Sequence, residues 1–179
     1  QFDRQLNTLN GELIQMGHMV EQAIEHAIEA MVHQDAEKAR QNMEFDSEVD
    51  QQEKDIETLC MKLLMKQQPV ARDLRLISAA LKMITDMERI GDQAADIADI
   101  VKVTSLGVPD ASIRLKDMAK ATASMVTKRI DAYVKQDLKL AREVIDFDDI
   151  VDDLFDEVKD EILQGMRKGI TCLLYTSDA

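Results

Sequence analysis

The chain has 179 residues, a length that suits one or two small domains. Its hydrophobic content of 45% can fill a core, although only 3% of the residues are aromatic. The net charge of −13 argues against nucleic-acid binding, because contact with phosphates requires Lys and Arg to displace counterions. The same charge argues against adhesion to anionic membranes and favours a partner protein with a basic surface.

The sequence also bears on the compartment. No apolar stretch approaches the roughly 20 residues that span a bilayer, so we expect no direct membrane insertion. The two cysteines, Cys60 and Cys172, indicate no disulfide framework, which is typical of a reducing compartment. No signal peptide is visible, but the chain starts at Gln1, so the prediction does not rest on this absence. We therefore predict a cytoplasmic protein.

The first 103 residues predict three long helices. Apolar residues in steps of three and four run from Phe2 to Ala30, the spacing of a helix packed in a left-handed bundle. A second helix is expected over about 36–66, between Asp35 as its N-cap and the break at Pro69. A third helix is expected over about 70–103. Strand patterns are poorly supported, so we predict an all-α fold.

The segment after the turn-rich stretch 104–110 repeats the first half of the chain. Without a gap, residues 28–50 and 130–152 are identical at eleven of 23 positions. The matches include charged residues that shared hydrophobic spacing does not explain, in the pairs Gln34-Asp35, Ala39-Arg40, Phe45-Asp46 and Val49-Asp50 with their counterparts 102 residues later. We predict tandem three-helix bundles, the first over residues 1–103, with the domain boundary in this stretch.

The second unit is expected to be incomplete. By the same shift its third helix should begin near residue 172, where the sequence reads TCLLYTSDA over 171–179 and ends. We therefore expect residues 110–168 to form two helices that lack the third. Residues 171–179 have no heptad pattern, and we interpret them as a foreign or disordered tail, a frayed genuine terminus being the alternative.

Acidic residues one helical turn apart lie beside the apolar stripes. On a helical wheel of about 100° per residue, Glu88 and Asp92 fall in the centre of the stripe that contains Leu81. On the second helix, Asp46 and Asp50 flank the buried stripe in the same way. Two such pairs on adjacent helices can converge on one site.

Convergent carboxylates have two interpretations. A carboxylate buried in a bundle must be protonated, paired or bound to a cation. Pairing with Arg75, Lys82 or Arg89, or a simply solvated acidic flank, is one interpretation. The other is a metal site, and carboxylate oxygens suit Mg, Mn or Fe better than metals that prefer soft ligands. The spacing alone leaves both open.

Other residue types indicate no catalytic chemistry. His18, His26 and His33 all lie on the first helix near its exposed side, and no Glu-x-x-His motif of the di-iron type is present. There is no nucleophile–base pair, no P-loop and no glycine-rich phosphate cradle. We therefore predict that the protein is not an enzyme and binds no organic cofactor.

Two uninterrupted strings carry a resemblance to a known family. Residues 68–82 read QPVARDLRLISAALK, and residues 85–98 read TDMERIGDQAADIA. Together they strongly resemble the third-helix signature of the PhoU family, and the Phe45-Asp46 string and its copy at Phe147 match the second and fifth helices of that family. The resemblance covers about residues 1–168.

The resemblance implies a set of metal ligands. In the family, acidic motifs on tandem three-helix bundles bind metal clusters, with iron or zinc among the metals. Carried over by position, the expected metal ligands at the first site are Asp46, Asp50, Glu88 and Asp92, extended by Asp96. Asp148 and Asp152 would serve a second site, which lacks its sixth-helix motif and is expected to be incomplete. The expected cofactors are divalent or ferric ions (Fe, Zn, Mn or Mg).

The resemblance also implies a function. It suggests a regulatory adaptor of phosphate uptake that represses the phosphate-starvation (Pho) regulon when phosphate is plentiful. The expected partners are a sensor histidine kinase, the ATPase subunit of the phosphate ABC transporter and a second copy of the chain. Two alternatives stay open: the PhoU-like domain of a sodium–phosphate cotransporter, and a carboxylate metal-binding bundle without a role in signalling.

Overall fold

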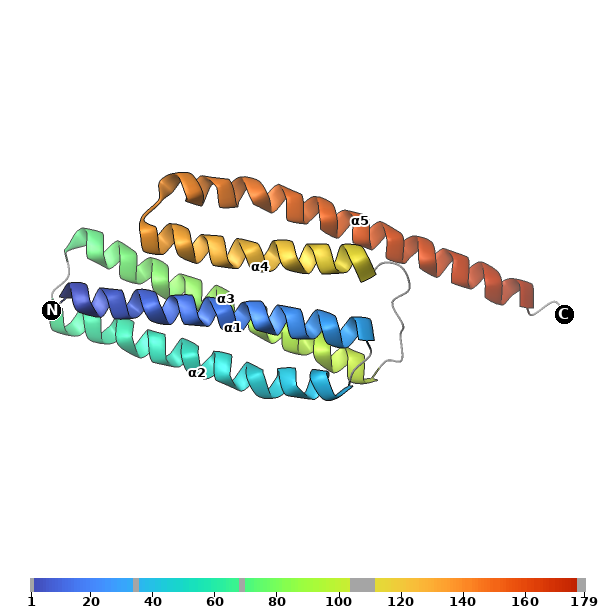
Figure 1. The fold of residues 1–179 in the computed structure, drawn as a ribbon, viewed down its shortest axis with the longest axis horizontal. Helices are drawn as coiled ribbons and strands as arrows, with labels where there is room; N and C mark the ends of the chain where they lie inside the picture. The colour runs from blue at the N-terminus through green and yellow to red at the C-terminus, as the bar shows by residue number, and fades with distance from the viewer. Residues whose placement is uncertain (1, 34–35, 68–69, 104–111, 177–179) are drawn as a thin grey trace.

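A computed structural model describes residues 2–33, 36–67, 70–103 and 112–176. They form five helices: α1 (Phe2–His33), α2 (Ala36–Gln67), α3 (Ala71–Val103), α4 (Ser112–Lys135) and α5 (Leu138–Thr176). Helices α1, α2 and α3 pack side by side as a bundle, and α4 and α5 lie along it as a hairpin (Figure 1). No strand occurs in the described part of the chain, which confirms the all-α prediction.

The core of the bundle follows from the periodicity of its helices. On α1, apolar residues three or four positions apart are fully buried, including Leu9, Leu13 and Met16. They meet similar stripes on the other two helices, represented by Ile56 of α2 and Ile84 of α3. Each helix exposes its remaining surface, so the bundle places polar residues at the edges where two helices meet.

Helix α4 belongs to the same hydrophobic core as α1–α3. Its side chains Ala123, Val126 and Ile130 are buried in one continuous cluster with residues of the first bundle. A Cβ added at Gly17 of α1 would overlap the side chain of Ile130, so glycine permits the close approach of α1 and α4. The two units of the repeat are therefore packed together, although their division into domains at 103 and 110 stays a prediction.

Polar contacts also connect α4 to α3. The hydroxyl of Tyr133 donates a hydrogen bond of 3.0 Å to the backbone oxygen of Leu76. Nearby, Arg129 forms an ion pair with Asp86 at 3.2 Å. These contacts, together with the packing against α1, hold α4 over the seam between α1 and α3.

The turn between α4 and α5 has well-defined caps. Gln136 adopts a left-handed conformation with φ of 53°, and Asp137 N donates to Ala132 O at 2.9 Å, which closes α4 with a Schellman motif. The carboxylate of Asp137 then accepts hydrogen bonds from the backbone of Lys139 and Leu140, as an N-cap does. Asp35, the predicted cap of α2 and the repeat counterpart of Asp137, lies outside the described residues.

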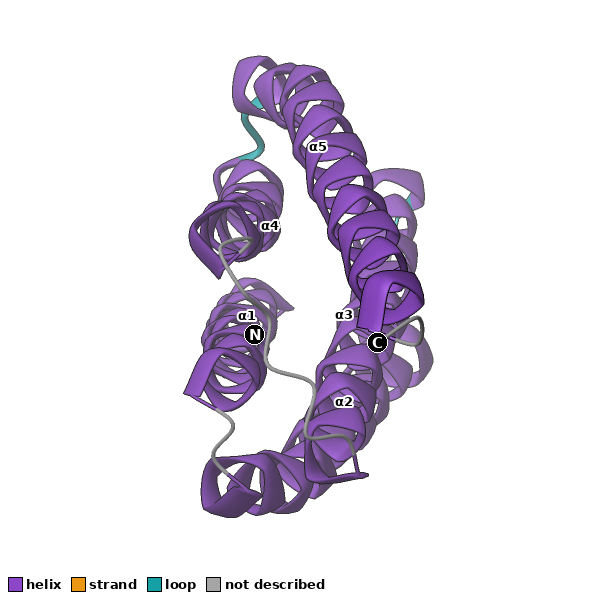
Figure 2. Ribbon diagram, turned by 90° about the vertical axis from the view of Figure 1, so that its right-hand side faces the viewer, coloured by secondary structure: helices purple, strands orange, loops and turns teal. Residues whose placement is uncertain are grey.

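Helix α5 packs against α4 (Figure 2). It extends beyond the end of α4 at which Ser112 lies (Figure 1). Residues 177–179 lie outside the described residues, and the interpretation of 171–179 as a foreign or disordered tail stays a prediction, but the helix itself continues through Thr176. The reason is local: residues 171–176 contain neither Gly nor Pro, so nothing in them breaks the helix. No described helix combines the length and apolarity that crossing a membrane requires.

Candidate metal centre

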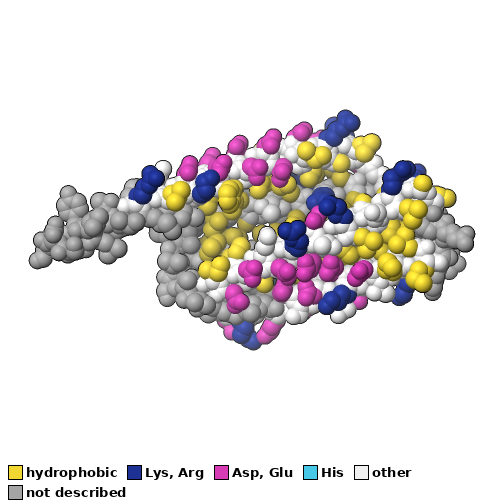
Figure 3. Space-filling model, turned by 180° about the vertical axis from the view of Figure 1, so that it is seen from behind, with side chains coloured by type: hydrophobic (Ala, Val, Ile, Leu, Met, Phe, Trp, Pro, Cys, Tyr) yellow, Lys and Arg dark blue, Asp and Glu magenta, His cyan; other side chains and the backbone are white. Residues whose placement is uncertain are grey.

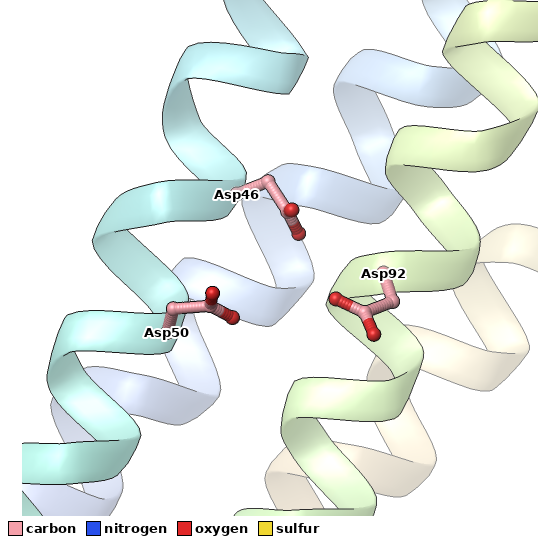
Figure 4. Close-up of side chains that lie close together, drawn as sticks. All are labelled: Asp46, Asp50 and Asp92. Carbon is pink, nitrogen blue, oxygen red and sulfur yellow. The ribbon is translucent and has the colours of Figure 1, made fainter.

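Three carboxylates converge where α2 and α3 pack together. Asp46 and Asp50 lie one turn apart on α2, and Asp92 faces them from α3 (Figure 4). One oxygen from each of the three lies within 4.8 Å of the other two. Within the described residues this is the cluster of acidic, histidine or cysteine side chains whose geometry could hold a metal ion.

Burial makes this cluster unusual for a group of acids. Asp46 and Asp50 are half-buried, and Oδ1 of each is inaccessible to solvent without a hydrogen-bond partner. An oxygen that has lost water and gained no donor is destabilised by up to several kcal/mol, more if it is charged. A cation between the helices would supply the missing interaction for both atoms.

Gly91 lets α3 approach these carboxylates. A Cβ at this position would lie 3.2 Å from Cγ1 of Val49 and 3.8 Å from Oδ1 of Asp46. The backbone of α3 is therefore as close to α2 as a residue without a side chain permits. This approach brings Asp92, the next residue, within reach of the two α2 carboxylates.

The electrostatics of the cluster are those of crowded like charges. Burial, followed by the charges of Asp92, Asp50 and Asp96, raises the pKa of Asp46. Burial raises the pKa of Glu88 as well, with Asp92 next and then Glu53. No basic side chain is among the causes of either shift, which disfavours the salt-bridge interpretation with Arg75, Lys82 or Arg89.

The placement of Glu88 and Asp92 differs from the sequence prediction. We expected both in the centre of the apolar stripe of α3, but Glu88 is half-buried and Asp92 is exposed. The buried face of α3 is centred about 100° from Leu81. It combines large apolar residues with small ones: Ile77, Ala80, Met83, Ile84, Met87, Gly91, Ala94 and Ala98. The acids therefore line the edge of the α2–α3 interface instead of its core.

The remaining predicted ligands lie farther out. Asp96 is exposed and contributes charge to Asp46 without joining the three-carboxylate cluster. Asp148 and Asp152 are exposed on α5, and no third group in the described part of the chain joins them. Their assignment as ligands of a second site stays a prediction.

One acidic residue at this edge was not predicted. Glu53 of α2 influences the pKa of Glu88, and its carboxylate accepts a hydrogen bond of 3.4 Å from the hydroxyl of Thr85. Its position was visible in the sequence, because Glu53 follows Asp46 by seven residues, which is two helical turns on the same face.

Comparison with known proteins identifies the family. The model of the PhoU domain matches residues 13–101 and again 115–175. A relative from Clostridium acetobutylicum named phosphate-specific transport system accessory protein PhoU homolog is 37% identical over 167 residues, which cover 92% of this chain and 76% of the relative. The relative of the same name from Pseudomonas aeruginosa is 32% identical, and the match spans 64% of its length.

Solved structures agree with the sequence comparison. The crystal structure of PhoU from Pseudomonas aeruginosa matches with a TM-score of 0.82 at 30% identity, covering 94% of this chain and 81% of that one. The phosphate transport system regulatory protein PhoU from Streptococcus pneumoniae matches with a TM-score of 0.83 at 26% identity, covering 94% of this chain and 80% of that one. The chain belongs to the PhoU family.

Proposed function

We propose that this chain is a cytoplasmic, non-catalytic regulatory accessory protein of phosphate-specific transport, and that a metal ion bound by Asp46, Asp50 and Asp92 joins its helices α2 and α3. Family membership supports the role in phosphate transport. The metal rests on one observation: two buried carboxylate oxygens of the same cluster have no hydrogen-bond partner.

The donor set bears on the identity of the metal. All three groups are carboxylates, with Glu88 and Asp96 near enough to influence the cluster electrostatically. Oxygen donors suit hard or borderline cations, so Mn²⁺, Mg²⁺ and iron fit well, and Zn²⁺ also accepts carboxylate ligands. A bound cation would neutralise the repulsion among these acids and oppose the rise in the pKa of Asp46.

The finer role that we propose is that of an adaptor. The chain would repress the phosphate-starvation regulon by linking the ATPase subunit of a phosphate transporter to a sensor histidine kinase, and it would act as a homodimer. A strongly acidic surface suits recognition of basic protein surfaces better than capture of the phosphate anion itself.

Thermal melting tests the metal. The wild type is melted with EDTA and then with Mn²⁺, Mg²⁺, Zn²⁺ or iron in excess, beside Asp50→Asn and the matched control Glu48→Gln, an exposed acid on the same helix. A metal that binds the cluster raises the melting temperature of the wild type and of Glu48→Gln with concentration, and that of Asp50→Asn much less. If no metal shifts the wild type, the cluster is an acidic patch only.

A reporter assay tests the regulatory role. The same three proteins are expressed in a bacterium that lacks its own PhoU protein, and a phosphate-starvation reporter is measured in high phosphate. We expect repression by the wild type and by Glu48→Gln. If the folded wild type does not repress, the regulatory proposal is wrong; if Asp50→Asn represses as well as the wild type, the metal is not needed for regulation.

A further inference from the structure

The end of the bundle where α2 is followed by α3 differs in charge from the rest of the molecule. The segment 61–82 contains a single acidic residue, Asp73, in a chain whose net charge is −13. The same segment contains five basic residues: Lys62, Lys66, Arg72, Arg75 and Lys82. This end is a basic region on an acidic protein, and the proposed metal site does not use it.

Large hydrophobic side chains are exposed at the same end. The exposed fraction is 47% for Met61, 79% for Met65, 67% for Val70 and 45% for Leu74. Isolated exposed hydrophobic residues are ordinary, but several gathered in one place mark an interaction site. We call these four residues, with the exposed basic residues Lys62 and Arg75, the end patch.

The register of α2 and α3 brings these residues together. The contact between Glu53 and Thr85 and the approach of Gly91 to Val49 fix how the two antiparallel helices align. Continued along the helices, this alignment places Met65 of α2 opposite Leu74 of α3. Seen from behind, hydrophobic side chains gather at this end (right in Figure 3), while acidic side chains form a row across the middle of the same face.

We infer that the end patch binds an amphipathic helix of a partner protein whose apolar face is flanked by Asp and Glu. Exposed apolar side chains at the end of α2 and at the start of α3 together offer the kind of surface on which such a helix lies. Met61 and Met65 have unbranched, adaptable side chains that repack around different partners. Lys62 and Arg75 match acidic residues at the edges of the incoming helix.

Charge also decides between possible occupants. A partner helix with acidic flanks is attracted to the end patch and repelled by the acidic row beside it, so on this face the charge pattern favours binding at the end patch. An anionic membrane would have to approach the whole acidic face, and a net charge of −13 opposes that approach. The observations therefore favour a protein helix over a lipid surface.

Binding of a designed peptide tests this inference. The probe is a synthetic amphipathic helix of about 18 residues, with Leu on one face and Glu beside it, and the comparison peptide carries Lys in place of Glu. We expect the wild type to bind the Glu peptide, more weakly as salt rises, and to bind the Lys peptide far less. Binding should be the same in EDTA and in excess metal, so this result does not depend on the proposed metal site.

Variants locate the binding surface. Met65→Ser with Leu74→Ser, and separately Lys62→Glu with Arg75→Glu, should each lower the affinity for the Glu peptide about tenfold or more. The matched control is Ile145→Ser with Arg142→Glu, an exposed apolar and basic pair on α5 that should leave the affinity unchanged. All of these side chains are exposed, and circular dichroism checks that each variant is folded.

Four outcomes would overturn the inference. They are equal binding of the Glu and Lys peptides, unchanged binding by both patch variants, patch-dependent sedimentation with phosphatidylserine vesicles, and self-association that the patch variants abolish. Either of the first two outcomes would show that the end patch is not the binding surface for an acidic helix. The third would show that its partner is a membrane, and the fourth that its partner is a second copy of the chain.

Discussion

Gly17 of α1 lies directly against Ile130 of α4, and the end of the Ile130 side chain occupies the space that a side chain at position 17 would need. This contact is one of the places where the first three helices and the α4–α5 hairpin meet. Because interiors pack densely, a single added carbon here is felt by both helices.

Substitution of Gly17 should therefore destabilise the protein. We expect Gly17→Ala to lower the free energy of unfolding by up to about 2 kcal/mol, because the cost of displacing the end of the Ile130 side chain exceeds the gain in helix propensity. Gly11→Ala is the matched control, since an added Cβ there meets nothing within 4 Å, and it should raise stability by about 0.5–1 kcal/mol. Urea unfolding measures both, and a stabilising Gly17→Ala would show that α4 is not seated on this glycine.

A buried amide holds α2 against α1. Gln52 is 9% exposed, and its Nε2 donates to the carboxylate of Glu12 at 2.7 Å and to the backbone oxygen of Glu12 at 3.3 Å. Gln52→Ala should cost about 1–3 kcal/mol, because it leaves a charged acceptor unpaired. Gln51→Ala should cost less than about 0.5 kcal/mol, since Gln51 is exposed and its bond is to Asp55 on its own helix. Equal losses would contradict this ranking.

Stability should fall in alkali because of Tyr133. Burial, and to a lesser degree the charge of Cys60, raises the pKa of Tyr133 to about 12. The unfolded phenol ionises near pH 10, so this contribution is complete below about pH 10 and is lost as the pH rises to about 12. Tyr133→Phe loses the bond to Leu76 at neutral pH but should lose less stability than the wild type as the pH rises from about 10 to about 12. Urea titrations at several pH values check this, with a parallel decline in both proteins as the contrary result.

Without metal, the acidic cluster should make stability depend on pH in mild acid. Burial raises the pKa of Asp46 above its ordinary value of 3.8, so the folded state holds this proton more tightly than the unfolded state. Stability in EDTA should then decrease as the pH rises from about 4 through the raised pKa, and Asp46→Asn should flatten the decline.

Added metal should reverse this trend, because cations bind the deprotonated carboxylates. The stabilisation by Mn²⁺ should grow as the pH rises from about 5 to 7.5, and Asp46→Asn should abolish it. Melting temperatures at four pH values, with Mn²⁺ or with EDTA, give both slopes. Identical slopes in the two conditions would speak against a metal at this cluster.

The helices were predictable because their boundaries are strongly marked. Pro69 interrupts the pattern after α2, and a turn-rich stretch follows α3, so the expected ranges of the first three helices agree with the structure to within a few residues. The face of α3 was not predictable in the same way. Its core contact uses Ala80, Gly91 and Ala98, whose small side chains carry little hydrophobic signal although they permit close packing.

The site could be predicted only in part for a related reason. One-turn spacing identified Asp46 and Asp50 correctly as neighbours on one face of α2. Which residue of α3 faces them depends on how far the two helices slide along each other, and spacing within one helix carries no information on that. The register is set by the approach of Gly91 to Val49, which selects Asp92 and leaves Asp96 outside the cluster.

The seat of Ile130 on Gly17 has a mechanical consequence. Helix α5 contains 39 residues and is therefore about 60 Å long, whereas α4, its support, contains 24 and is about 36 Å long. Because α4 supports only part of α5, a small rotation of α4 displaces the unsupported end of α5 by a large distance. If α4 tilts by about one degree on α1, the far tip of α5 moves by about 1 Å. The close contact of Gly17 with Ile130 is one of the contacts that resist such a tilt, together with those of Tyr133 and Arg129.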